Sequence, residues 1–312
     1  MSLTGIHFLL SYRCTDECDH CFLWSSPKAK GTMTLAQIRD VLKQAKDLGT
    51  VETIFFEGGE PFLFYPVMLD GLREAASFSF ETGIVTNCYW ATCVEDAVRW
   101  LRPLAEIGIG TLSLSSDLFH GEEMMTQAAR NAIEAARQLD LPENTITIEA
   151  PEGYAATDQT DKGEPITGGP VRFRGRAVAA LLDGVPRRPW TKFTECPDED
   201  FATPGRVHVD AFGHLHVCQG LLMGNLWQRP LKETVASYDP SAHPIIGPLI
   251  EGGPVALVQR YDLPHEETYA DACHLCYVAR DLLRTRFPEY LAPNIAYGDL
   301  EEATTLSMGA TD

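Results

Sequence analysis

The architecture of this chain can be inferred from the segment Gly5-Ile-His-Phe-Leu-Leu-Ser-Tyr-Arg-Cys14-Thr-Asp-Glu-Cys18-Asp-His-Cys21-Phe22. A short apolar run leads directly into three cysteines with the spacing C-x3-C-x2-C. Three thiolates this close together can hold three irons of a [4Fe–4S] cluster and leave the fourth iron open for another ligand. Zinc is the alternative, with His20 or a distant residue as the fourth ligand, because structural zinc requires a closed tetrahedron.

A second motif follows the next apolar run. Residues 51–56 are rich in strand-forming side chains and end in Glu57-Gly58-Gly59-Glu60-Pro61. The glycines allow another group to approach the backbone closely, and the nearby carboxylate suits an ammonium group. The same residues could also form an ordinary turn.

The cysteine triad, the strand and the GGEP motif, in this order, resemble the radical S-adenosylmethionine (SAM) superfamily. The resemblance implies that Cys14, Cys18 and Cys21 hold a [4Fe–4S] cluster whose open iron chelates the amino and carboxylate groups of SAM. It further implies that Phe22 lies beside the adenine and that the GGEP motif receives the amino group. Cluster and cofactor carry the radical chemistry, and the protein binds and orients the reactants.

Length, charge and cysteine content limit the other possibilities. The chain has 312 residues, a formal net charge of −19 and nine cysteines, which suits one large domain with a small appendage. Basic patches are scarce, so we expect no nucleic-acid partner. No apolar stretch approaches the length of a membrane span, and no signal peptide is evident. Cysteines at metal-ligand spacings favour metals over disulfides and a cytoplasmic location.

The first half of the chain alternates strands and helices. Thr34 and Gln37 form a capping-box pattern ahead of a helix that Gly49 ends. The order predicts an α/β protein with a parallel sheet, and the resemblance implies a partial (β/α)6 TIM-type barrel. The expected strands cover 5–11, 51–57, 80–86, 109–115, 144–150 and about 170–174, and the expected helices cover 34–48, 66–77, 94–102 and part of 121–139.

We expect three parts: the partial barrel over residues 1–185, a small auxiliary-cluster domain over 186–298, and a disordered tail over 299–312. Residues 151–169 are rich in Gly, Thr, Asp and Pro. They form either a loop at the open face of the barrel or a disordered surface insertion. The first strand begins at about Gly5, which leaves no room ahead of it for a leader-peptide-binding domain, although such domains can be separate proteins.

A second cysteine set lies downstream and comprises Cys196, Cys218, Cys273 and Cys276. Cys218 ends a G-x4-C element on an expected hairpin over 207–217, and Cys273 and Cys276 form a C-x2-C element. The four thiolates could close around one metal centre, either an iron–sulfur cluster or structural zinc.

This set resembles the auxiliary-cluster domains called twitch and SPASM. Gly175-Arg176-Ala177 and Met223-Gly224-Asn225-Leu226 resemble the segments that flank it in that family. The resemblance implies an auxiliary iron–sulfur cluster, with [4Fe–4S] as the expected type. Cys196 departs from the usual spacing and is the doubtful fourth ligand.

Polar side chains at the ends of the expected strands are further candidates. For SAM binding we consider the residues that follow the GGEP strand and its neighbours: Gly58, Gly59, Glu60, Asn87, Ser115, Asp117 and Arg176. For catalysis the candidates are Asp117, Glu149, Cys88 and Cys93, although strand-end carboxylates are often caps and free cysteines often behave as small apolar residues.

The resulting hypothesis is a radical SAM enzyme that reductively cleaves SAM and abstracts hydrogen from a substrate C–H bond, in the oxidative modification of a peptide or protein. A low-potential flavodoxin or ferredoxin would supply the electron. One alternative is a dehydrogenase or biosynthetic enzyme for a small molecule. Another is a protein that binds iron–sulfur or zinc without catalysis.

Overall fold

The computed structural model describes residues 2–151, 162–165 and 168–299. Most of the expected loop over 151–169 lies outside the described residues, and so does the expected tail apart from Asp299. No helix in the described part of the chain is long and apolar enough to cross a bilayer.

Six strands pair in parallel and follow the order of the sequence: β1 (Gly5–Ser11), β2 (Thr53–Gly58), β3 (Glu81–Thr86), β4 (Thr111–Ser115), β5 (Glu143–Glu149) and β6 (Gly168–Pro170). The prediction of an α/β fold with a partial barrel is confirmed. The sixth strand lies slightly earlier than expected.

The helices between these strands are α1 (Leu35–Leu48), α2 (Tyr65–Ser77), α3 (Val94–Ile107) and α4 (Gln127–Gln138). Thr34 and Gln37 form the predicted capping box at the start of α1, and Gly49 ends the helix in the left-handed conformation. Helix α3 continues through Pro103 beyond its expected end, because Leu101 and Leu104 on either side of the proline are both fully buried.

The second half of the chain extends the same sheet. The predicted hairpin is present as β8 (Arg206–Val209) and β9 (His214–Cys218), and β10 (Leu221–Asn225) follows it. Strand β8 pairs in parallel with β1, so the sheet of the described residues has the order β10-β9-β8-β1-β2-β3-β4-β5-β6. The expected boundary near residue 185 is therefore crossed by sheet hydrogen bonds.

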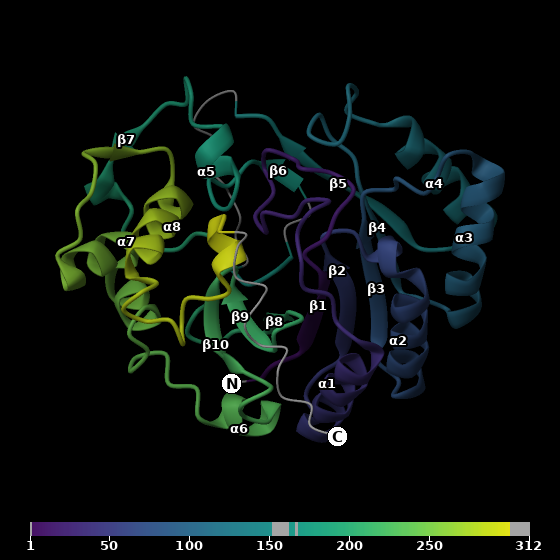
Figure 1. Cartoon of the computed structure of the whole chain (residues 1–312), viewed down its shortest axis with the longest axis horizontal. Coiled ribbons are helices and arrows are strands. Elements are labelled where there is room, and N and C mark those ends of the chain that lie inside the picture. The colour runs from purple at the N-terminus through teal and green to yellow at the C-terminus, as the bar shows by residue number, and fades with distance from the viewer. Residues whose placement is uncertain (1, 152–161, 166–167, 300–312) are drawn as a thin grey trace.

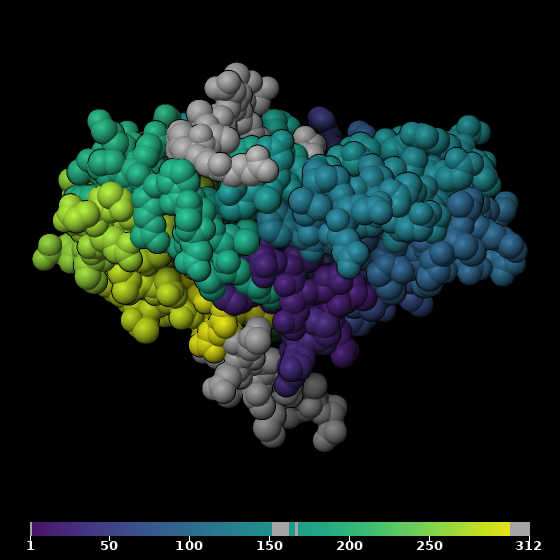
Figure 2. Space-filling view, turned by 90° about the horizontal axis from the view of Figure 1, so that it is seen from above, coloured from purple at the N-terminus to yellow at the C-terminus, as the bar shows by residue number. Residues whose placement is uncertain are grey.

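The remaining elements are short, except for two helices. They are α5 (Ala177–Ala180), β7 (Arg188–Pro189), η2 (Trp190–Lys192), α6 (Leu231–Ala236), α7 (Ile246–Tyr261), β11 (Thr268–Tyr269), α8 (Ala272–Leu283) and η3 (Asn294–Tyr297). Figure 1 shows α1–α4 on one side of the molecule and α7 and α8 on the other. In Figure 2 the N-terminal residues, coloured purple, lie between two groups. The blue and teal residues that follow them in the first half are on one side, and the green and yellow residues of the second half are on the other.

Candidate active site and second cysteine cluster

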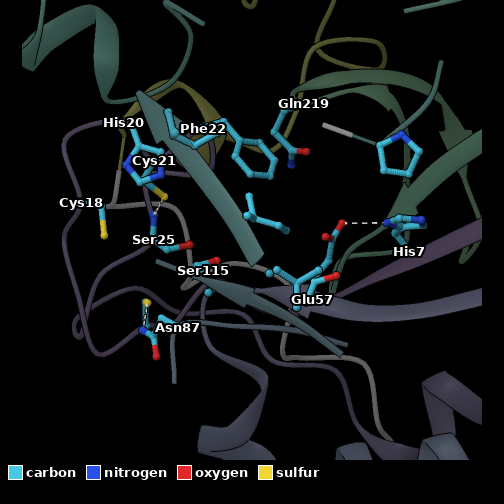
Figure 3. Close-up of a pocket in the computed structure, with 18 of the residues that line it drawn as sticks. His7, Cys18, His20, Cys21, Phe22, Ser25, Glu57, Asn87, Ser115 and Gln219 are labelled. Atoms are coloured by element: carbon cyan, nitrogen blue, oxygen red, sulfur yellow. Dashed lines mark hydrogen bonds and ion pairs between the residues drawn. The ribbon is translucent and has the colours of Figure 1, made fainter. Parts of the chain in front are cut away.

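A cavity lies at the carboxyl ends of the parallel strands, where barrel enzymes build their sites. The first cysteine set lines one end of it together with several of the predicted SAM-binding residues: Cys14, Cys18, Cys21, Phe22, Gly58, Gly59, Asn87 and Ser115. Figure 3 shows Cys18 and Cys21 at this end and His7 and Glu57 at the opposite end. The cavity therefore has a cysteine end and a polar end.

The cysteine loop is held from a distant part of the chain. Arg176 donates hydrogen bonds to the main-chain oxygens of Cys18 (2.8 Å) and Ser25 (2.6 Å). Gly175 has a positive φ of +60°, and a Cβ at this position would lie 2.5 Å from the main-chain oxygen of Cys21. The segment Gly175-Arg176-Ala177 thus holds the cysteine loop in place through hydrogen bonds and close packing. Only glycine fits at position 175.

The sulfur environment fits a bound cluster. The side-chain amide of Asn87 lies 3.6 Å from the sulfur of Cys14, and the main-chain nitrogen of Ser25 donates to the sulfur of Cys21 at 3.4 Å. Burial raises the pKa of Cys14 to about 12 and also raises that of Cys18. The thiols therefore stay protonated unless a metal replaces the protons, and hydrogen bonds to sulfur are typical of iron–sulfur sites.

The second cysteine set lines a separate small cavity. Cys196 lies after η2, Cys218 ends β9, and Cys273 and Cys276 lie in the first turns of α8. Cys196, the doubtful ligand, faces the same cavity as the other three. Burial raises the pKa of Cys196, Cys273 and Cys276.

Two arginines, the partly buried Arg174 and the buried Arg280, face this second cavity. Arg174 lies 3.5 Å from the sulfur of Cys218, and Arg280 is 2% exposed and donates to the main-chain oxygen of Gln219 at 2.8 Å. Burial alone would lower the pKa of both arginines, but the surrounding thiols and acidic or phenolic groups raise it above the ordinary value. Two fixed positive charges suit a centre made of four thiolates, which carries net negative charge.

A comparison with protein families assigns the first half of the chain: residues 8–150 match the radical SAM superfamily. This chain contains a radical SAM domain. The match includes the cysteine loop, the GGEP segment and strands β2–β5 in full, so it supports the predicted radical SAM domain with SAM and a [4Fe–4S] cluster as its cofactors.

Two curated relatives resemble parts of the chain. YydG of Bacillus subtilis, which is named for peptide biosynthesis, is 23% identical over 197 residues, covering 61% of this chain and 60% of YydG. The tungsten-containing aldehyde ferredoxin oxidoreductase cofactor-modifying protein of Pyrococcus furiosus is 29% identical over 114 residues, covering 36% of this chain and 30% of that protein. The chain thus spans less than two thirds of the length of either relative.

Among solved structures, BtrN in complex with AdoMet and 2-DOIA has a similar fold. The TM-score is 0.50 at 16% sequence identity, with 74% of this chain and 81% of the BtrN chain covered. This likeness supports the α/β fold of the described residues.

The side chain of Glu60, which the sequence predicted to bind the SAM amino group, points into the core. Its side chain is fully buried and is not among the described residues that line the cavity. It caps η1 (Pro61–Phe64) by accepting from the main-chain nitrogen of Phe62 at 3.0 Å. Burial raises its pKa to about 7. Within the GGEP segment, Gly58 and Gly59 face the cavity, and an ion pair between Glu60 and the SAM ammonium group has no support from this geometry.

Asp117 and Arg176 are likewise directed elsewhere. The Asp117 carboxylate is buried and accepts from His120 (2.8 Å) and from the main-chain nitrogen of Ile148 (3.0 Å). Burial alone would raise the pKa of Asp117, but His120 lowers it. His120 lines the cavity, whereas Asp117 does not. The guanidinium of Arg176 donates its hydrogen bonds to main-chain oxygens of the cysteine loop.

The other catalytic candidates lie away from the cavity lining formed by the described residues. Cys88 is fully buried in the apolar core, Cys93 is exposed and caps α3 through its sulfur, and Glu149 is exposed at the end of β5. Their positions support the structural alternative for the two cysteines.

Sequence reasoning missed the polar end of the cavity, which is lined by His7, Glu57, His208 and Gln219. A signal was present, because His7 and Glu57 interrupt otherwise apolar strands. A polar residue in such a strand must point into a polar space or find a buried partner.

Proposed function

We propose that this enzyme oxidatively modifies a peptide or protein by abstracting a hydrogen atom from a C–H bond. The observation that carries the proposal is the single cavity in which the three loop cysteines face a polar wall some distance away. When bound, the cluster and SAM supply reductive cleavage of SAM and a 5′-deoxyadenosyl radical. The resemblance to YydG supports a peptide as the substrate class.

The residues of the chain would divide the work between the two ends of the cavity. Cys14, Cys18 and Cys21 would hold the cluster, and Gly58 and Gly59 let the end of β2 pack closely against the backbone of Ser11 and Arg13 that leads into the cysteine loop. Asn87 lies beside the cysteine loop, since its side-chain amide donates a hydrogen bond to Asp16 at 2.7 Å. The polar end is left to hold the substrate and to exclude water from the reacting carbon.

The second cysteine set would hold an auxiliary iron–sulfur cluster that accepts the electron from the substrate radical. Arg174 and Glu199 support this role, because both residues line the first cavity and the second. The two cavities therefore share a wall made of charged side chains 3.5 Å apart. A low-potential flavodoxin or ferredoxin would supply the first electron, and we place the enzyme in the cytoplasm.

The test is anaerobic purification and reconstitution, followed by dithionite and SAM. A brown protein with two clusters by iron and sulfide analysis that forms 5′-deoxyadenosine is expected. Short peptides encoded beside the gene are then added, and a modified peptide with two hydrogens fewer by mass spectrometry identifies the substrate. A colourless zinc protein, or one that forms no 5′-deoxyadenosine, would overturn the proposal.

A further inference from the structure

The polar end of the cavity holds a compact group of two histidines and one carboxylate. His7 on β1 and His208 on β8 are register partners, and Glu57 lies at the end of β2 on the other side of β1. One carboxylate oxygen of Glu57, Oε1, lies 3.1 Å from Nδ1 of His7 and 2.7 Å from Nε2 of His208. The three side chains lie on adjacent hydrogen-bonded strands, so their mutual positions are fixed.

The two short contacts between the imidazole nitrogens and the Glu57 carboxylate oxygen each require a positively charged group or a proton between the two atoms. An unprotonated imidazole nitrogen and a carboxylate oxygen repel each other, so each contact needs a bridging proton or cation. A divalent cation can take the place of such protons, because metal sites are built from ionised carboxylates and neutral imidazoles.

A second group of the same composition provides a contrast. Asp210, His214 and His216 also bring two imidazoles to one carboxylate, and its oxygens accept from Tyr12, from two main-chain nitrogens and from both imidazoles. That carboxylate is saturated and lies outside the cavity lining of the described residues. In contrast, Oε2 of Glu57 has no hydrogen bond to a described residue, and Glu57 faces the cavity.

A buried amide in the same cavity points to an additional ligand. Gln219 is 5% exposed and lines the cavity; its amide interacts with the Tyr12 side chain, but its amide oxygen makes no hydrogen bond to a described residue. A buried polar group without a partner is costly. Figure 3 shows Gln219 beside the cavity that also contains His7 and Glu57.

We propose that His7, Glu57 and His208 bind one divalent first-row transition metal ion at the polar end of the cavity. Two imidazoles and one carboxylate are a common donor set for such ions and leave coordination positions open. The ion takes the place of the two bridging protons, which move to the far nitrogens of the imidazoles, so the imidazoles stay neutral and no proton is released. The open positions face the cavity, where an oxygen or nitrogen of the substrate can bind.

Arg206 places a cation beside the site, because its guanidinium lies 3.4 Å from Nε2 of His208. Its hydrogen bonds go to the main-chain oxygens of Gly163 (3.2 Å) and Glu164 (3.3 Å), and Glu199 lies 3.9 Å away. Its charge is thus partly balanced by these acceptors and by the Glu199 carboxylate.

The test measures metal binding alone and needs neither SAM nor substrate, so it is independent of the proposed function. Reconstituted protein with both clusters oxidised, and therefore diamagnetic, is treated with a chelator until iron equals sulfide. Mn²⁺ is then titrated in, and free Mn²⁺ is followed by electron paramagnetic resonance. We expect one bound Mn²⁺ per chain, displaced by one Zn²⁺.

Three variants at the site are compared with one matched control. Glu57→Gln, His7→Gln and His208→Gln should each weaken Mn²⁺ binding at least tenfold, whereas His214→Gln in the saturated group should leave it unchanged. Circular dichroism and iron content show whether each variant has folded. If one site variant does not fold, the other two still test the proposal. The absence of a bound equivalent in the wild type, retained affinity in folded site variants, or an equal loss in His214→Gln would overturn the proposal.

Discussion

The buried carboxylate of Glu60 accepts a hydrogen bond from the main-chain nitrogen of Asn87 at 2.8 Å. It also accepts from the hydroxyl of Thr86 at 2.9 Å, so the segment after β2 holds the end of β3 in place. The Asn87 side chain in turn donates to Thr15 in the cysteine loop at 2.8 Å. The side chain of Glu60, which we predicted from the sequence to contact the cofactor, thus positions Thr86 and Asn87 at the wall of the cavity.

Replacing Glu60 with Gln should weaken SAM binding about tenfold, indirectly. A Gln side chain carries one acceptor oxygen and one amide group that cannot accept, so it cannot serve the nitrogens of both Phe62 and Asn87. The affinity is measured from the change that SAM causes in the paramagnetic resonance of the reduced cluster. The control is Glu149→Gln, at an exposed position, and an unaltered affinity in Glu60→Gln would show that Asn87 keeps its place without the carboxylate.

The stability of the protein should depend on the protonation of Glu60. Because the pKa of Glu60 is raised in the folded state, from 4.5 to about 7, its contribution is fully present below pH 4.5 and is lost as the pH rises through 7. The difference in unfolding free energy between wild type and Glu60→Gln should fall by about 3 kcal/mol over this range, at roughly 1.4 kcal/mol per pKa unit. Urea denaturation at several pH values measures it, and a flat difference would contradict the burial effect.

Replacing Gly59 with Ala should prevent normal assembly of the first cluster. A Cβ at this position would lie 2.0 Å from the main-chain oxygen of Arg13, next to Cys14, so the cysteine loop must move. We expect at least a tenfold loss of SAM cleavage. Gly205→Ala is the matched control, since its Cβ meets only the Thr4 hydroxyl at 3.7 Å, and similar activity in the two variants would contradict the prediction.

Replacing Cys14, Cys18 and Cys21 together with Ala should remove one cluster and all reductive SAM cleavage. The second cysteine set faces a different cavity, so its iron should remain. Iron, sulfide and 5′-deoxyadenosine are measured after anaerobic reconstitution. Residual SAM cleavage in the triple variant would show that the open cluster lies elsewhere.

Replacing Cys196 with Ser should lower the auxiliary iron content or destabilise the second half of the chain, because a bound metal centre contributes to folding. SAM cleavage without substrate should survive in part. Mössbauer spectroscopy of the reconstituted protein measures the cluster. Cys93→Ser, at an exposed cap, is the control, and an unperturbed auxiliary cluster in Cys196→Ser would remove Cys196 from the ligand set.

Local patterns made much of this structure predictable. The capping box at Thr34, the strand that precedes Cys14 and the hairpin that ends at Cys218 depend on neighbouring residues, so the sequence shows them directly. Roles that depend on distant partners could not be found this way. Arg176 contacts Cys18 across a separation of 158 residues.

The same limit applies to the polar end of the cavity. His7, Glu57 and His208 meet only because β8 pairs with β1, and no pattern in the sequence indicated that pairing. The direction of the Glu60 side chain is hard to predict for a related reason, since the sequence of a carboxylate beside two glycines does not indicate whether it turns toward the cavity or into the core.

The pairing of β8 with β1 also constrains how the chain folds. Thr4 and its partner Gly205 at the start of this pairing are 201 residues apart, so during synthesis the outer edge of β1 has no partner until the hairpin has been made. An exposed strand edge promotes association with other chains, and such a distant closure is slow. We therefore expect a fragment ending near residue 185 to aggregate when it is produced alone, although it carries a complete cysteine loop.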